Sequence, residues 1–259
     1  MKHIAIPSMS AKSHRPYTAP GMGDRVHSVT LGYMYGLEHG TKVTLHLTHD
    51  KVTGGDGGKA QSWQDIIALF PPGVVQVMAH RVSGLPNVDW VEYLRGMGFT
   101  AECYRYGDAA DLPLQGDFPL DAAPYLKPSP MLEPIDCAAD MALPKIYATV
   151  QWDAGGKPWC RKRLPPDKQQ RIARQYTETM GLDLVTVGGQ ATDPLLRTSL
   201  PHVGYAMANA QLHIGVDSGP MHLAWLYLRP EFMHLYPVNE RSHHVMRWLA
   251  NGVKGDYFA

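Results

Sequence analysis

Cysteine is scarce in this chain of 259 residues. Cys103, Cys137 and Cys160 are odd in number, scattered and without metal-ligand spacing, which argues against a disulfide framework and indicates reduced thiols. Long hydrophobic runs are also absent, and Lys2 is followed by only a short apolar segment. We therefore expect a folded cytoplasmic protein with neither a targeting segment nor a membrane span.

A net charge is missing too, since 24 Lys and Arg balance 24 Asp and Glu. The balance hides an asymmetry between the two halves of the chain. Residues 1–144 hold 11 basic against 15 acidic residues, a net −4, whereas residues 145–259 hold 13 against 9, a net +4. The second half is therefore expected to be the better anion binder.

Several familiar ligand motifs are absent. The glycine run at 54–58 lacks the Gly-Lys-Ser/Thr ending of a P-loop, and Gly21-x-Gly23 is followed by Val26 where a dinucleotide fingerprint needs glycine. The 13 histidines show neither HxxxH nor HExxH spacing. We therefore expect a site without a metal or a resident cofactor.

Strand and helix patterns alternate along most of the chain, which predicts an α/β fold with parallel sheets. The expected strands are 3–7, 42–47, 74–79, 100–104, 145–151, 183–187 and 211–216. The expected helices are 24–38, 61–70, 89–97, 166–180, 201–209 and 240–249. A proline-rich stretch, 112–144, indicates a crossing between two Rossmann-like domains, residues 1–140 and 141–259.

The most informative segment is residues 205–227. A short apolar strand ends at Asp217, and Ser218-Gly219-Pro220 then supplies an N-cap hydroxyl, a backbone without a side chain and a proline suited to a first helical turn. Such a helix start presents unpaired N–H groups to an anion. His222 falls in the first turn, where its ring could reach the same ligand.

A second helix start lies near the amino terminus, in the sequence PGMGDRVHSV. Gly21 and Gly23 let the backbone pass close to a ligand, and Asp24 occupies the helix N-terminus. Without further support, Asp24 would be a capping carboxylate with no catalytic role.

Together these segments resemble glycosyltransferase family 9, the heptosyltransferase-like enzymes. The run VDSGPMHLAWLYLRP is similar to the donor-site signature of that family, and Met-Gly-Asp to its amino-terminal motif, although Arg25 precedes Val26. The resemblance implies two Rossmann-like domains facing a cleft, the GT-B type, with an acceptor-side first domain and a donor-binding second domain. It makes Asp24 the catalytic base. On the acceptor side we add Gly23, Arg25 and His27.

Two further stretches are candidates for donor binding. The family has a lysine before an aromatic residue and a proline, which fits either Lys157 or Lys162, and Arg163 adds a cation beside a departing diphosphate. A strand ends in Gly188-Gly189, where a nucleoside could lie against the backbone, with Gln190 or Asp193 as a ribose partner.

The resulting hypothesis is an inverting, metal-independent glycosyltransferase. It would move a sugar from a nucleotide-sugar donor to an acceptor hydroxyl, with a saccharide as the family default. A hydroxylated base in DNA is an alternative acceptor, because residues 157–174 form a basic stretch with Trp159 inside it. A nucleotide-sugar epimerase or hydrolase and a non-catalytic sugar-nucleotide binding module remain as other classes.

Overall fold

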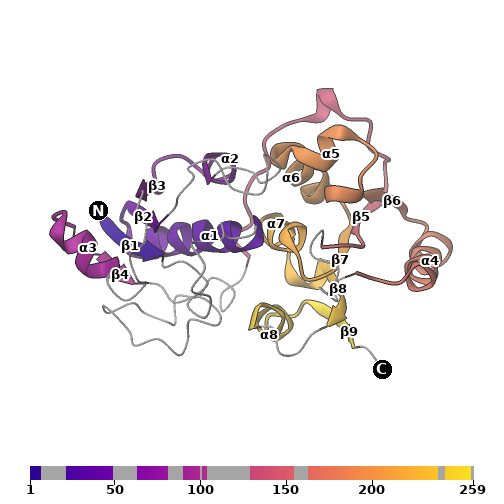
Figure 1. Cartoon of the computed structure of the whole chain (residues 1–259). Helices are drawn as coiled ribbons and strands as arrows, with labels where there is room; N and C mark the ends of the chain where they lie inside the picture. The colour runs from indigo at the N-terminus through magenta and orange to yellow at the C-terminus, as the bar shows by residue number, and fades with distance from the viewer. Residues whose placement is uncertain are drawn as a thin grey trace. The chain divides into compact units, whose positions relative to one another are not determined.

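The computed structural model describes residues 1–6, 22–48, 63–80, 90–99, 101–103, 129–154, 163–238 and 243–257. The chain forms two compact units, Met1–Pro124 and Tyr125–Ala259 (Figure 1). The expected division at residue 140, with acceptor and donor roles on either side, stays a prediction.

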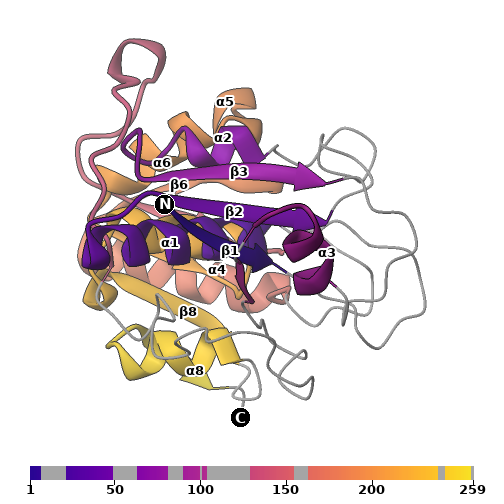
Figure 2. The same ribbon diagram turned by 90° about the vertical axis from the view of Figure 1, so that its left-hand side faces the viewer.

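The first unit is built on a parallel sheet with strand order β3-β2-β1-β4. Its elements are β1 (Lys2–Ile6), α1 (Met22–His39), β2 (Val43–Thr48), α2 (Trp63–Ile67), β3 (Val75–His80), α3 (Trp90–Gly96) and β4 (Ala101–Cys103). Helix α1 lies along the sheet (Figure 2) and contacts β2 and β3. Apolar residues at helical spacing, including Val26 and Val29, are buried there, as the periodicity predicts.

The second unit has a parallel sheet of order β6-β5-β7-β8-β9. Its strands are β5 (Tyr147–Gln151), β6 (Asp183–Thr186), β7 (Leu212–Gly215), β8 (Met233–Val238) and β9 (Lys254–Tyr257). Its α-helices are α4 (Pro166–Arg174), α5 (Pro194–Thr198), α6 (Leu200–Ala208), α7 (Gly219–Tyr227) and α8 (His243–Ala250). Four short helical segments complete it: η5 (Ala138–Asp140), η6 (Gln175–Thr179), η7 (Gly188–Gln190) and η8 (Pro230–Phe232).

The two faces of this second sheet differ in character. One face is apolar, because Val150 and Ile214 pack with Ile172 of α4 in a buried cluster. The other face turns toward α6, where the Tyr147 hydroxyl donates a hydrogen bond of 2.8 Å to the Ala206 carbonyl. The alternation of side chains along a strand places Tyr147, Thr149 and Gln151 together on this second, polar face.

The expected α/β fold with parallel sheets is confirmed, with element boundaries shifted by a few residues. One expected helix, 166–180, is divided into α4 and the π-helical turn η6. Helix α5 and strands β8 and β9 were not among the expected elements. In β9, Lys254–Tyr257 has no apolar run and gains its strand conformation from pairing with β8. Helix α8 packs within the second unit, because its Trp248 contacts His222 of α7.

Candidate functional site

The order of the strands marks one edge of the second sheet as a binding position. From β5 the chain crosses to β6 on one side and then to β7 on the other side of β5. Ligands of open parallel sheets bind at such a switch point, beyond the carboxyl ends of the two diverging strands. In this unit the switch point lies beyond Gln151 of β5 and Gly215 of β7.

Helix α7 begins at this switch point, three residues beyond Val216. Asp217 and Ser218 are buried, and Pro220 stands in the first turn as expected. Ser218 occupies the N-cap position, but its side chain does not cap the helix. Instead, its Oγ donates a hydrogen bond of 2.7 Å to Oε1 of Gln151. This bond joins the two strands that diverge at the switch point and leaves the first-turn N–H groups uncapped by Ser218.

Gly188 brings a third strand end to the same place. Its φ is +77°, and a Cβ there would lie 3.2 Å from Pro220 Cγ and 3.6 Å from Gln151 Cγ. A residue with a side chain would therefore be strained in backbone and crowded against the start of α7. Gly189 has open space in the direction of a Cβ. The expected donor residues Gly188, Ser218 and Gly219 thus lie at one sheet edge.

Gln151 is a member of this site that the sequence did not indicate. It is buried and bonded to Ser218, although 67 positions separate the two residues. In the sequence, the one feature that could have pointed to Gln151 is its place as the last residue of the expected strand 145–151. This position indicates a site residue only when β7 is known to be the neighbour of β5.

His222 lies in the first turn of α7, as expected, but its ring is buried. The ring contacts the edge of Trp248 at 4.7 Å between centroids and 69° between planes. Its backbone N–H donates to the Ser218 carbonyl at 3.3 Å. A phosphate contact by the same ring stays a prediction, and any such contact would be made by a side chain that also packs in the core.

The basic loop is described only at its two ends. Asp153 and Arg163 form an antiparallel bridge, with Arg163 Nε 3.6 Å from Asp153 Oδ2. Because the Arg163 side chain is 64% exposed, this ion pair adds little stability and the guanidinium can turn toward a ligand. Lys157 and Lys162 lie outside the described residues, so the choice between them stays a prediction.

In the first unit, Gly23 and Asp24 are the second and third residues of α1. The Asp24 side chain lies outside the described part of the structure. Arg25 and His27 are buried. The expected helix start is therefore present, while the catalytic and acceptor-side roles stay predictions.

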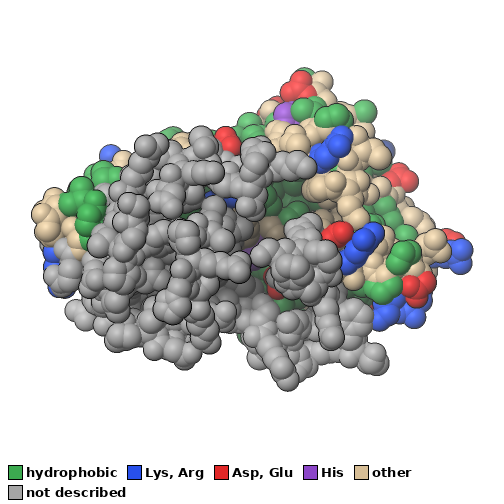
Figure 3. Space-filling model, in the orientation of Figure 1, with side chains coloured by type: hydrophobic (Ala, Val, Ile, Leu, Met, Phe, Trp, Pro, Cys, Tyr) green, Lys and Arg blue, Asp and Glu red, His purple; other side chains and the backbone are tan. Residues whose placement is uncertain are grey.

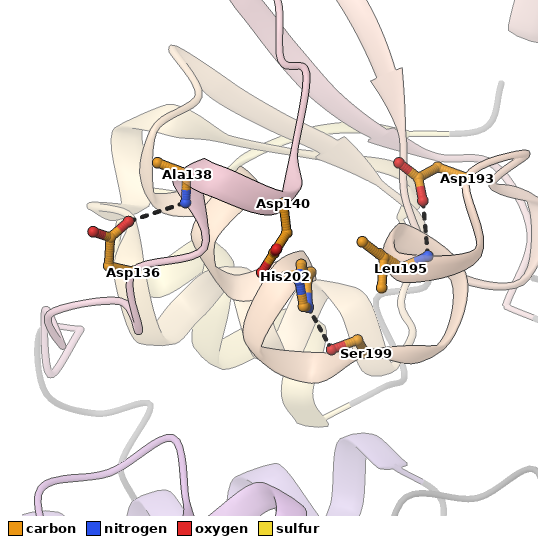
Figure 4. A network of polar contacts seen from close by, with 7 residues as sticks. All are labelled: Asp136, Ala138, Asp140, Asp193, Leu195, Ser199 and His202. Atoms are coloured by element: carbon orange, nitrogen blue, oxygen red, sulfur yellow. Dashed lines mark hydrogen bonds and ion pairs between the residues drawn. The ribbon is translucent and has the colours of Figure 1, made fainter.

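A separate polar network lies around the starts of α5 and α6 (Figure 4). The Asp193 carboxylate accepts a hydrogen bond of 2.8 Å from the Leu195 N–H and so caps α5. His202 lies between Ser199, 2.7 Å from Nδ1, and Asp140, 3.6 Å from Nε2. Capping gives Asp193 a structural task, which weakens the expectation that it binds a ribose.

The described residues form neither a membrane-spanning helix nor a cluster of metal ligands. No described helix is both long and apolar enough to cross a membrane. Within the same residues, no group of three or more His, Cys, Asp or Glu side chains is arranged to hold a metal ion.

Comparison with known proteins finds a family match over the segment that contains the start of α7. Residues 165–237 match glycosyltransferase family 9 (heptosyltransferase). Among solved structures, the chain is similar to ADP-heptose LPS heptosyltransferase II of E. coli, with 12% identity, 100% of this chain and 90% of that chain covered, and a TM-score of 0.50. A search of curated proteins found no match.

Two further solved structures are similar at lower TM-scores. The iron-containing dodecameric glycosyltransferase TibC from enterotoxigenic E. coli H10407 has 14% identity, 90% of this chain covered and a TM-score of 0.48. This chain spans 57% of the TibC chain. The family 9 glycosyl transferase of Veillonella parvula DSM 2008 has 12% identity, 90% of this chain and 80% of that chain covered, and a TM-score of 0.47.

The matched segment runs from just before α4 through most of β8 and includes η7, Asp217, Ser218 and α7. The likeness to heptosyltransferase II concerns the fold, and it agrees with the parallel sheets of both units. The resemblance read from the motifs is therefore confirmed as a match: residues 165–237 of the second unit match the glycosyltransferase family 9 (heptosyltransferase) model, and the α/β fold is similar to that of a GT-B heptosyltransferase.

Proposed function

We propose that this protein is a glycosyltransferase that moves a sugar from a nucleotide-sugar donor to an acceptor hydroxyl. The observation that carries the proposal is the start of α7 at the switch point of the second sheet, inside the segment that matches family 9. A helix N-terminus at this edge suits the diphosphate of such a donor.

The donor side would work through the backbone and nearby cations. Gly219 and Met221 carry N–H groups in the first turn of α7, while Pro220 has none to leave unpaired. The helix dipole adds favourable potential for an anion. Arg163, with Lys157 or Lys162, would neutralise the charge that develops as the bond between sugar and diphosphate breaks.

The chemical step needs a base on the acceptor side, and Asp24 is our candidate. Its carboxylate would take the proton of the acceptor hydroxyl while the oxygen attacks the anomeric carbon in line. The new glycosidic bond forms as the nucleoside diphosphate leaves, which inverts the configuration at that carbon. Support for this role comes from the motif resemblance and from the place of Asp24 at the start of α1.

A panel of ADP-, UDP-, GDP- and CDP-sugars tests the proposal. Release of nucleoside diphosphate that depends on an added hydroxyl acceptor would support transfer. Turnover without an acceptor would favour the epimerase or hydrolase, and binding without turnover would favour the binding module. A repeat in EDTA tests metal independence, since loss of activity restored by Mg²⁺ or Mn²⁺ would contradict it.

DNA remains a second candidate acceptor, because α4 carries Lys168, Arg171 and Arg174 at intervals of three residues. Against it, the chain has no net charge, and on the face shown in Figure 3 the described Lys and Arg side chains are scattered among acidic ones. Salt-dependent binding to duplex and single-stranded DNA would support this acceptor, and its absence would leave the saccharide.

A further inference from the structure

A fully buried histidine lies on the polar face of the second sheet, next to the proposed donor site. His213 of β7 has no exposed surface, and its Nδ1 lies 3.0 Å from Thr149 Oγ1 on β5. Among the described residues, its other ring nitrogen, Nε2, has no hydrogen-bond partner. Such an atom is costly to bury unpaired, so a partner in some state of the protein is expected.

Strand register places one candidate partner, the side chain of Gln151, on the same face of the sheet. A Cβ added to Gly215 would lie 2.7 Å from Nε2, so the ring extends from position 213 over Gly215 toward the carboxyl end of β7. Gly215 is the register partner of Gln151, and neighbouring strands are about 4.8 Å apart. The Gln151 side chain therefore starts beside Nε2, on the same face of the sheet, and ends at Ser218.

The direction of the bond between Ser218 and Gln151 matters for an anionic ligand. In the structure Ser218 Oγ donates its proton to Gln151 Oε1. A serine whose proton is used in this way presents only oxygen lone pairs to a diphosphate. These lone pairs repel the negatively charged diphosphate oxygens. If the carboxamide of Gln151 is turned over, its N–H donates to Ser218 Oγ, and the serine proton is released for the ligand.

We propose that His213 is a positioning residue of the donor site, which holds Gln151 turned over so that Ser218 donates its proton to the donor diphosphate. The inference rests on the proposed function, because it takes the start of α7 as the diphosphate site. For this the carboxamide must shift as well as turn over, since neither of its terminal atoms is hydrogen-bonded to Nε2 in the structure. Nε2–H then donates to Gln151 Oε1, and Nδ1 accepts the proton of Thr149. Each of the four side chains then donates one hydrogen to the next group, and the second N–H of the Gln151 carboxamide takes no part in this chain.

The ring can do this because it stays neutral. Burial lowers the pKa of His213 to about 3, so one ring nitrogen carries hydrogen and the other a lone pair at neutral pH. Its described neighbours on both strands, Thr149, Gly215 and Gln151, carry no charge. The Thr149 hydroxyl can donate or accept and so fits either tautomer; a bond from Nε2–H to Gln151 requires the tautomer in which Nδ1 accepts.

Two substitutions at one position separate positioning from packing. His213→Gln reaches the place of Nε2, whereas His213→Asn reaches only the place of Nδ1 and keeps the bond to Thr149. The probe is whichever of ADP, UDP, GDP and CDP wild type binds most tightly, measured by calorimetry. We expect His213→Asn to weaken diphosphate binding roughly three- to tenfold and His213→Gln to stay within about twofold. The matching nucleoside, which lacks phosphates, should bind equally to all three proteins.

A double-mutant cycle with Ser218→Ala completes the test. If His213 acts through Ser218, His213→Asn should weaken diphosphate binding no further in the Ser218→Ala background. Should His213→Asn fail to fold, Gly215→Ala replaces it, because its Cβ displaces the ring while sparing Gln151 and Ser218. Equal affinities in Asn and Gln variants, or additive losses, would overturn the inference alone. No nucleoside diphosphate binding by wild type would overturn the proposed function and this inference with it.

Discussion

Each of the two parallel sheets has one face lined with polar side chains, and the two faces differ in how these groups are paired. In the first sheet, His3 Nδ1 lies 2.8 Å from His46 Nε2, and Gln76 donates to Thr44 at 2.8 Å. In the second sheet, the bond between Thr149 and His213 leaves Nε2 of the ring without a described partner.

The difference separates polar groups that hold a sheet together from polar groups that serve a ligand. The first polar face pairs its side chains with one another. The second continues through Gln151 to Ser218, at the first turn of α7. A paired buried group contributes to stability, whereas a group left with unused bonding capacity beside a helix N-terminus is suited to binding. The following experiments test this contrast.

The largest effect is expected from Asp24, which belongs to the first unit but not to its polar face. Asp24→Asn should lower turnover roughly 10²- to 10⁴-fold, because the general base is lost. Nucleoside diphosphate affinity should stay within a few fold, since binding is assigned to the second unit. Steady-state kinetics and calorimetry measure both quantities, with the exposed Asp65→Asn of α2 as control. Normal turnover in Asp24→Asn would remove this residue from the chemistry.

His222 tests whether one side chain of the second unit both packs and binds. His222→Ala should reduce the free energy of unfolding by roughly 2 kcal/mol, because the ring contact with Trp248 is lost. His222→Phe keeps an aromatic ring there and should recover most of that stability in urea unfolding. If the ring also contacts the diphosphate, both variants bind nucleoside diphosphate more weakly. Full affinity in His222→Phe would show that packing is its whole role.

The change of the free energy of unfolding with pH should differ between the histidines of the two sheets. Burial lowers the pKa of His213 from 6.5 to about 3, so below pH 6.5 the unfolded chain binds a proton that the folded chain does not. The free energy of unfolding should therefore fall as pH decreases from 6.5, by about 1.4 kcal/mol per pH unit from this group.

Substitution of each histidine shows which residue causes this change of the free energy of unfolding with pH. Burial also lowers the pKa of His3, but this ring is less enclosed than that of His213. Urea unfolding at pH 7, 6 and 5 should show a shallower slope for His213→Gln and little change for His3→Gln. The reverse order would contradict the contrast between the two polar faces.

The smallest effects come from a matched pair of threonines, one on each polar face. Thr44→Val and Thr149→Val each remove one buried hydroxyl at similar volume and should each cost about 1 kcal/mol of stability. Only Thr149→Val should also weaken nucleoside diphosphate binding, by roughly threefold, because Nδ1 of His213 loses the hydroxyl proton that it accepts in the proposed chain of hydrogen bonds. Equal affinities in the two variants would remove the distinction between the faces.

Local sequence was sufficient for the elements and for part of the site. Alternating apolar residues produced β7, and Ser218-Gly219-Pro220 correctly marked the start of α7. These features depend on backbone preferences and side-chain periodicity within a few residues, so they can be read from a single chain. Strand β9 could not be read in this way, since its pairing with β8 stabilises it.

The partners of the site residues were decided only by the tertiary structure. Gln151 meets Ser218, Gly188 meets Pro220, and His222 meets Trp248 across long intervals of sequence. Crossover connections set which strands become neighbours, and strand register then sets which side chains share a face. Local spacing alone predicts that a helix start suited to an anion follows a buried strand. The fold places Gln151 next to this helix start, and it places His213, whose Nε2 has no partner among the described residues, on the neighbouring strand. Local spacing in the sequence encodes neither position.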